Sequence, residues 1–298
     1  MQAEGDFLEF GGASRGGPVS AADRRLVRSL VSELVTVADD LSHIATGSWP
    51  PEGSIAGAQL QIAWNQTTAL EASPIRAAHA SLIFANSAGT EHARAFINNV
   101  NSKKFSFSLA TLTRGALEAF AKSYFVMNTD DPGELLSRQV SLAISEMSAS
   151  RKHNKFVTQS GEIADIEVFL AGQKRLLSDL NLPLITGPDL GVTKLASALL
   201  DASANTGMGR KFYSQLSGVA HGETAALGMF LVGAPGLVQF RIPRELVVEY
   251  AGMISASCIT VMDRMMLMFG LELKHQQRWN GAKSRANTAL ALMQSQFP

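Results

Sequence analysis

Two otherwise apolar segments of this sequence carry polar side chains at helical spacing. In the first segment, Arg114 and Glu118 are one helical turn apart, beside Leu117 and Phe120. In the second segment, the polar residues that share one helix face are Arg210, Ser214, Ser217 and His221. Tyr213 lies at the margin of that face. A histidine can act as an acid or base and an arginine can stabilise negative charge, so these residues are candidates for a functional site.

These two polar faces have two interpretations. In the first, they meet and form a buried network, which is costly unless it is fully hydrogen-bonded and is typical of functional sites. In the second, they are a surface ion pair and an exposed helix face, worth only tenths of a kcal/mol. Because both helices are apolar enough to be central, we expect the faces to meet, with His221 within reach of Glu118. Arg114 and Tyr213 are then expected to line the same space between the helices.

The same residues carry a family resemblance. The two strings concerned are Leu112-Thr-Arg114-Gly-Ala-Leu-Glu118-Ala-Phe and Tyr213-Ser-Gln-Leu-Ser217-Gly-Val-Ala-His221-Gly. They resemble a group of bacterial helical proteins that have an Arg-x-x-x-Glu helix and a later Tyr-x-x-Leu-Ser-x-x-x-His helix. These proteins are grouped loosely with the HEPN-like helical bundles. The resemblance covers about 20 residues directly and the layout of residues 105–230.

The resemblance implies an intracellular bacterial protein that acts on RNA, in a toxin or phage-defence setting. HEPN ribonucleases use an arginine and a histidine, four to six residues apart on one helix and brought together in a dimer. The histidine moves a proton from the ribose 2′-hydroxyl, and the arginine stabilises the phosphorane. The implied catalytic residues are His221, Arg114 and Glu118, with Arg210 as an alternative charge stabiliser. The implied binding residues are Tyr213, Ser217 and Arg210.

The spacing of arginine and histidine in this sequence departs from the HEPN pattern, so a second, non-catalytic function is also considered. Arg210 precedes His221 by eleven residues, roughly 16 Å along a helix, so the two cannot share a site without a symmetry mate or another helix. Arg114 is the possible substitute. The alternative is a non-catalytic helical module, in which the same network is structural or binds a small ligand and the protein works through a partner protein.

Composition limits both hypotheses. The 298 residues carry 26 Lys and Arg against 26 Asp and Glu, which argues against a clamp for nucleic acid or anionic membrane but leaves room for a local basic groove. The single cysteine, Cys258, excludes an intrachain disulfide and a multi-cysteine zinc site, and fits a reducing cytoplasm. We therefore expect a cytoplasmic protein.

No cofactor, metal or membrane association is expected. The uncharged stretches are too short or too polar to span a bilayer. Two acid–histidine spacings, Asp39 with His43 and Glu272 with His275, lack the further ligands that a metal site needs. The Gly-x-Ser-x-Gly string at Gly12–Gly16 matches a serine-hydrolase motif but lies outside any strand-to-helix elbow.

Periodicity predicts an all-α bundle of roughly eight to ten helices with at most one short β-hairpin, in which Leu237–Ile242 alternates as a strand. Residues 1–20 are expected to be a disordered tail, and residues 21–298 a single helical domain. The expected helical segments are 21–46, 73–86, 91–100, 105–127, 132–150, 163–180, 190–203, 209–231, 243–268 and 280–294.

A homodimer is the expected assembly. Gly218 and Gly222 would permit another helix to approach closely, and the terminal helix offers a further face. A twofold pair is the commonest way to cover such surfaces.

Overall fold

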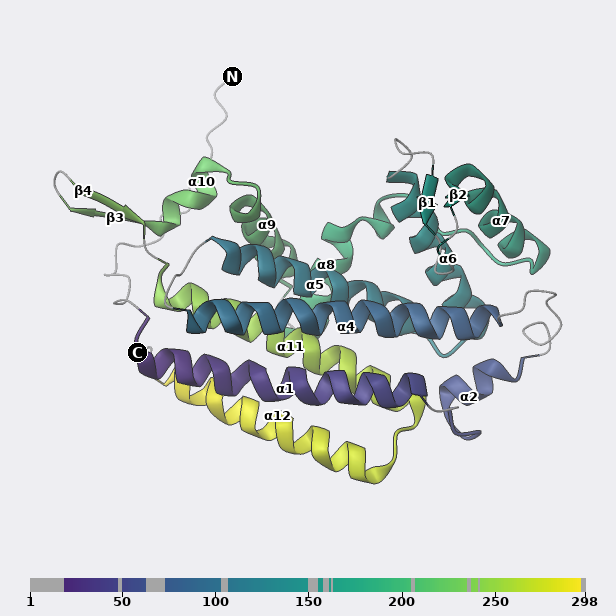
Figure 1. Ribbon diagram of the computed structural model, residues 1–298, viewed down its shortest axis with the longest axis horizontal. Coiled ribbons are helices and arrows are strands. Elements are labelled where there is room, and N and C mark those ends of the chain that lie inside the picture. The colour runs from purple at the N-terminus through teal and green to yellow at the C-terminus, as the bar shows by residue number, and fades with distance from the viewer. Residues whose placement is uncertain are drawn as a thin grey trace, which may run out of the picture.

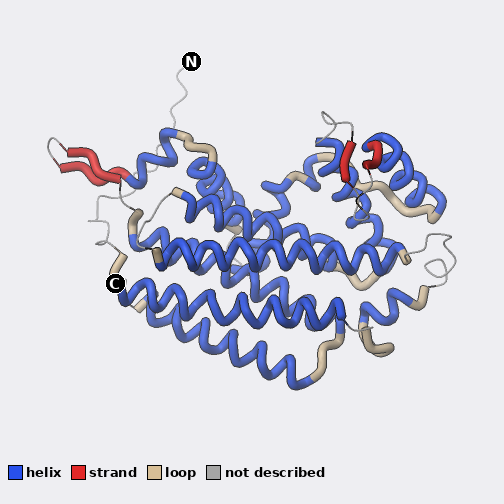
Figure 2. The backbone as a smooth tube through the Cα atoms, in the orientation of Figure 1, coloured by secondary structure: helices blue, strands red, loops and turns tan. Residues whose placement is uncertain are grey.

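The computed structural model of this chain describes residues 19–47, 50–62, 73–102, 107–149, 155–157, 161, 163–204, 207–234, 237–240 and 242–295. Helices form most of this part of the chain, with four short strands at its periphery (Figures 1 and 2). The all-α prediction is confirmed. The described residues contain eleven α-helices, slightly more than expected, because two of them are too short for periodicity to reveal.

The helices follow one another with few long connections. In chain order they are α1 (Ala21–Gly47), α2 (Ile55–Leu60), α4 (Pro74–Asn101), α5 (Ser108–Met127), α6 (Pro132–Ala149), α7 (Ile166–Asp179), α8 (Val192–Ala204), α9 (Gly209–Ala220), α10 (Thr224–Leu227), α11 (Arg244–Phe269) and α12 (Leu273–Gln294). Two 3-10 turns are η2 (Pro188–Leu190) and η3 (Gly228–Phe230). Helix α12 begins at Leu273, seven residues before the predicted start at residue 280.

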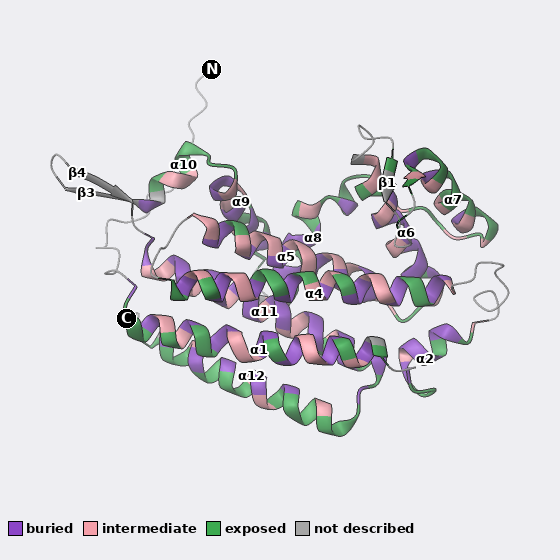
Figure 3. Cartoon of the chain, in the orientation of Figure 1, coloured by how far each residue is buried: buried purple, intermediate pink, exposed green. Residues whose placement is uncertain are grey.

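Long helices build the centre of the molecule. Helix α1 contacts α4, α11 and α12, and α5 contacts α4, α8, α9 and α11 (Figure 1). One cluster of buried apolar side chains extends along the chain from Val19 to Met293. Figure 3 shows the outward face of α12 as mostly exposed. Helix α5 lies among α4, α8, α9 and α11. It carries Arg114 and Glu118, so the candidate site lies where α5 meets these neighbours.

Helix α11 is a core helix. The seam that the sequence predicts is buried along its whole length, at Val247, Tyr250, Ile254, Cys258, Val261, Met265 and Met268. Among the described helices, α11 alone has the length and composition of a membrane span. Its most apolar 18-residue stretch has a mean hydropathy of 1.4, and 61% of that stretch is buried in the bundle. Burial raises the pKa of the Cys258 thiol to about 12, which keeps it protonated.

Helix α4 is continuous, although the sequence predicts a break at Gly89-Thr90. Ser73 begins the helix, its Oγ accepting the Arg76 amide at 3.3 Å. The glycine serves packing between helices. A Cβ at Gly89 would lie 2.5 Å from Cδ1 of Phe120 on α5. Glycine therefore lets the Phe120 ring rest on the backbone of α4, so α4 and α5 can pack closely.

Helix α9 ends at Ala220, so the predicted single helix over residues 209–231 is wrong. Gly222 has a φ of 73° and ends the helix in the left-handed conformation. The Glu223 amide donates to the Gly218 carbonyl at 2.9 Å, and the Gly222 amide donates to the Val219 carbonyl at 3.1 Å. These are the two bonds of a Schellman C-cap. They place His221 at the end of α9, where its side chain leaves the helix.

The strands form two antiparallel ribbons rather than the single hairpin expected. Strand β3 (Leu231–Ala234) pairs with β4 (Leu237–Phe240), which lies within the predicted strand. The unexpected ribbon joins β1 (Lys155–Val157) and β2 (Ile163–Asp165), in which Phe156 pairs with Ala164. Three-residue strands leave too short an alternation for the sequence to predict.

The beginning of the chain is only partly described. Residues 1–18, which include the Gly12–Gly16 string, lie outside the described residues. Val19 and Ser20, which the sequence analysis places in the tail, belong to the folded body: Val19 is buried, and Ser20 Oγ accepts the Asp23 amide at 3.1 Å. Asp23 accepts the Ser20 amide in return, at 2.8 Å, which caps α1 reciprocally.

Candidate functional site

Helix α5 positions the first two residues of the site. Its buried face includes Ala116, Leu117 and Phe120, so Arg114 and Glu118 lie on the opposite side. Arg114 Nε donates to Glu118 Oε1 at 2.6 Å, and the two side chains are 21% and 25% exposed. The pair is therefore partly desolvated, which makes it worth more than a surface ion pair.

Helix α9 supplies the other two residues. Tyr213 is 1% exposed, and its hydroxyl donates to the same oxygen, Glu118 Oε1, at 2.5 Å. Arg114 Nη1 lies 2.7 Å from His221 Nε2. A guanidinium has only donors, so the imidazole accepts this bond and carries its own proton on Nδ1. The Arg114 guanidinium carbon also lies 5.8 Å from the centre of the Tyr213 ring.

The two helices meet as predicted, but through Tyr213 and His221 of the α9 segment, and His221 contacts Arg114 rather than Glu118. Arg114, Glu118, Tyr213 and His221 form one chain of contacts between α5 and α9. Its burial is graded rather than complete: Tyr213 is buried, Arg114 and Glu118 are half-buried and His221 is exposed. The exposed end can therefore reach a ligand, while the buried end holds the guanidinium in place.

The charges at this site are well defined. Burial raises the pKa of Tyr213 to about 12, and the hydrogen bond and charge of Glu118 add to this effect, so Tyr213 is a neutral donor at physiological pH. Burial lowers the pKa of Arg114, but the hydrogen bond and charge of Glu118 outweigh it and raise the pKa above its usual range. The site thus presents a permanent cation beside an imidazole.

The other two candidates, Ser217 and Arg210, lie along α9 outside this chain of contacts. Ser217 is half-buried, one turn before His221, and its carbonyl accepts the His221 amide at 2.9 Å. Arg210 is exposed at the beginning of α9. The arginine next to His221 is therefore Arg114 of another helix. The Arg–His pair is complete in one chain.

Gly218, one of the two glycines that suggested a dimer, is covered by this chain. A Cβ at Gly218 would lie 2.9 Å from Ala226 Cβ and 2.9 Å from Glu223 Oε2. The close approach at Gly218 is therefore made by α10 and the turn before it. The terminal helix likewise packs on α1. Gly218 and the inner side of α12 are therefore used within this chain, whereas a Cβ at Gly222 would meet open space and the outward face of α12 is exposed.

A second histidine lies beside the site, and the sequence analysis missed it. A Cβ at Gly115 would lie 2.9 Å from both Cε1 and Nδ1 of His92 and 3.0 Å from its Nε2. The exposed His92 ring of α4 thus rests on the α5 backbone at the residue that follows Arg114. A glycine in the middle of a helix is the available signal, since it often marks close approach.

The remaining described histidines, His43, His79 and His275, are not part of this site, and His275 lies on α12. His79 is buried on α4, 2.9 Å from Gln59 Oε1, and burial lowers its pKa to about 4. His43 lies 3.8 Å from Asp39 at the surface. In the part of the chain that the structure describes, no three His, Cys, Asp or Glu side chains are grouped to hold a metal ion.

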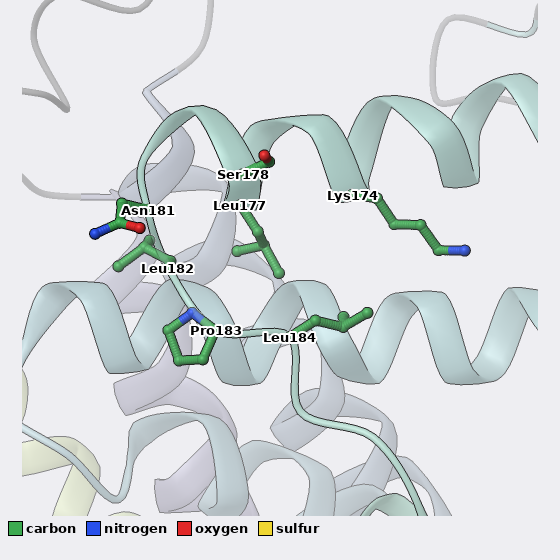
Figure 4. A pocket seen from close by; sticks show the side chains of 7 residues that line it. All are labelled: Lys174, Leu177, Ser178, Asn181, Leu182, Pro183 and Leu184. Atoms are coloured by element: carbon green, nitrogen blue, oxygen red, sulfur yellow. The ribbon is translucent and has the colours of Figure 1, made fainter.

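A pocket of about 500 Å³ lies elsewhere, between the end of α7 and the segment that follows it (Figure 4). Asn181, with a φ of 53°, ends α7 there, and the Leu182 amide donates to the Leu177 carbonyl at 2.8 Å. The lining residues are Lys174, Leu177, Ser178, Asn181, Leu182, Pro183 and Leu184. None of them belongs to the Arg114–His221 site, so this pocket is a separate feature.

Comparison of the chain with protein-family models, with curated proteins and with solved structures finds no significant match. The function must therefore be argued from the site itself.

Replacing Glu118 by alanine is expected to lower the free energy of unfolding by about 1.5–3 kcal/mol, because the buried Tyr213 hydroxyl loses a charged acceptor. The value is below the roughly 3–5 kcal/mol of a fully buried pair, since Glu118 is 25% exposed. Denaturant unfolding measures it. Glu91→Ala is the matched control, because Glu91 pairs with Arg94 but is 69% exposed. Equal loss in the two variants would contradict a special role for Glu118.

Proposed function

We propose that this chain is a HEPN-related bacterial ribonuclease of the cytoplasm, acting in a toxin or phage-defence setting. His221 takes the proton of the ribose 2′-hydroxyl, and Arg114 stabilises the charge that develops on the phosphorus oxygens. Glu118 and Tyr213 hold Arg114 in position. The site residues come from one chain, so a dimer is not needed to assemble them.

The contact between Arg114 Nη1 and His221 Nε2, at 2.7 Å, carries this proposal. Transesterification of RNA needs a base within hydrogen-bond reach of the 2′-hydroxyl and a cation within reach of the phosphate oxygens, and this contact places an imidazole and a guanidinium side by side. Arg114 bonds to Glu118 through Nε and to His221 through Nη1, so its third nitrogen, Nη2, takes part in neither bond. A phosphate that binds Arg114 would bring its neighbouring ribose to the imidazole.

The surface of α9 supports an extended anionic substrate. Arg210, Ser214 and Ser217 follow the face that ends at His221, and the first two are exposed. The face runs for roughly 16 Å. Its cation and hydroxyl groups can contact successive phosphates, so we propose that Arg210 and Ser217 bind the strand at a distance from the scissile bond.

The alternative function is a non-catalytic module that binds a small ligand or a partner protein through the same residues. One observation favours it. His221 Nε2, the atom that must accept the 2′-hydroxyl proton, already accepts a bond from Arg114. In a ribonuclease the substrate hydroxyl must displace that bond, whereas in a structural network the bond persists.

A pair of matched oligonucleotides tests the proposal. The purified chain is incubated with single-stranded RNA and with the same sequence lacking every 2′-hydroxyl. We expect cleavage of the RNA alone, giving 2′,3′-cyclic phosphate and 5′-hydroxyl ends, because the 2′-oxygen is the nucleophile. Binding of both strands without cleavage would contradict the ribonuclease proposal and support the non-catalytic binding module. Cleavage of the 2′-deoxy strand would contradict the mechanism.

A further inference from the structure

The proposed reaction requires a second proton transfer, and the Arg114–His221 pair does not supply it. This inference rests on the proposed ribonuclease activity. When the 2′-oxygen attacks phosphorus, the bond from phosphorus to the 5′-oxygen breaks and leaves an alkoxide. An alkoxide is a poor leaving group unless an acid protonates it. His221 receives a proton in the same step, so the donor must be another group.

The buried members of the site are unsuitable as that donor. Burial raises the pKa of Tyr213 to about 12, and its proton is already committed to Glu118. Glu118 accepts hydrogen bonds from both Arg114 and Tyr213 through Oε1, as a carboxylate does. Arg114 keeps its proton, because its pKa is raised. The donor must therefore come from a neighbouring element.

His92 is placed to be this donor. Its imidazole rests on Gly115, which adjoins Arg114 and precedes Glu118 by three residues, a rise of about 4.5 Å along α5. The ring comes from α4 and lies against Gly115, whereas His221 follows α9 and contacts Arg114, so imidazoles from two different helices contact adjacent residues of α5. On its own helix, Glu91 and Arg94 pair with each other, and Arg94 also binds Asp39 of α1.

We propose that His92 is the general acid of this site and that the scissile phosphate binds on α5 between His92 and His221. His221 Nε2 takes the 2′-hydroxyl proton as the 2′-oxygen bonds to phosphorus. The bond from phosphorus to the 5′-oxygen breaks, and protonated His92 gives that oxygen its proton. The products are a 2′,3′-cyclic phosphate and a 5′-hydroxyl, and water then exchanges the protons of the two imidazoles.

The position of the His92 ring depends on the absence of a side chain at Gly115. Glycine within a helix is unfavourable relative to alanine, and α5 is otherwise rich in residues that suit a helix. Any Cβ at this position would overlap the His92 ring, with three ring atoms at 3.0 Å or less. Gly115 therefore lowers the stability of α5 but allows the exposed His92 imidazole to lie against the helix.

A substrate with a sulfur leaving group tests this assignment. Wild type, His92→Ala and His43→Ala are compared on ordinary RNA and on RNA in which sulfur replaces the scissile 5′-oxygen. We expect His92→Ala to lower kcat about 100-fold or more on ordinary RNA and to cleave the sulfur substrate near the wild-type rate, because a thiolate leaves without protonation. His43 is a matched exposed histidine, and its variant should behave like wild type on both.

The outcomes separate this inference from the function on which it rests. If wild type cleaves RNA and His92→Ala does so equally well, the inference fails and the ribonuclease stands. A His92→Ala defect that persists on the sulfur substrate also overturns the acid role. If wild type cleaves neither substrate, the proposed function fails and the inference with it. Gly115→Ala, which displaces the ring while keeping the histidine, should reproduce the His92→Ala defect and its rescue.

Discussion

Replacing His221 by alanine is expected to lower kcat for RNA cleavage by about 10²- to 10⁴-fold, the usual contribution of a positioned general base. The KM for RNA should change little, because Arg114 and the α9 face still bind the phosphates. The sulfur substrate should not rescue this variant, since a better leaving group does not replace the base that activates the 2′-hydroxyl.

The stability of His221→Ala should match that of the parent within about 0.5 kcal/mol, as for most surface substitutions. His221 is exposed, and Arg114 retains its ion pair with Glu118. Single-turnover cleavage and denaturant unfolding measure the two effects separately. A variant that keeps more than about a tenth of the parent's kcat would contradict a role for His221 as base.

The sequence predicted the meeting of α5 and α9 for a physical reason. Each helix has one polar face and is otherwise apolar, so packing in a bundle brings polar faces together or exposes them. Glu118 and the Tyr213 hydroxyl satisfy each other only when the helices meet, whereas Arg210 and Ser214 of the predicted α9 face remain exposed. The long seam of α11 was predictable for a similar reason, since its apolar spacing matches the helical period throughout.

The ends of elements and the close contacts were less predictable. Gly222 ends α9, whereas Gly89 leaves α4 unbroken, although both are single glycines in helical patterns. The difference depends on tertiary structure: Gly89 receives the ring of Phe120, and Gly222 adopts a left-handed conformation. Likewise, Gly115 signals a close approach, but only the crossing of α4 and α5 determines that His92 makes it.

Replacing Arg114 by lysine is expected to lower kcat/KM for RNA by about 10²- to 10³-fold, although the charge is kept. The guanidinium reaches Glu118 through Nε and His221 through Nη1. An ammonium is a single point charge, so it cannot hold both contacts and also present a planar edge to phosphate. Arg210→Lys is the matched control, because Arg210 is exposed and is proposed to contact the strand through charge alone.

Arg114→Lys and Arg210→Lys should therefore differ in which kinetic property changes as well as in the size of the change. Arg114→Lys should lower kcat and cleave the sulfur substrate as poorly as ordinary RNA, because phosphorane charge must be stabilised whichever atom leaves. Arg210→Lys should leave kcat and the salt dependence of KM close to those of the parent, since phosphate contacts of this kind depend on charge. Full activity in Arg114→Lys would mean that a cation suffices beside His221, and the fork geometry fixed by Glu118 and Tyr213 would then be structural.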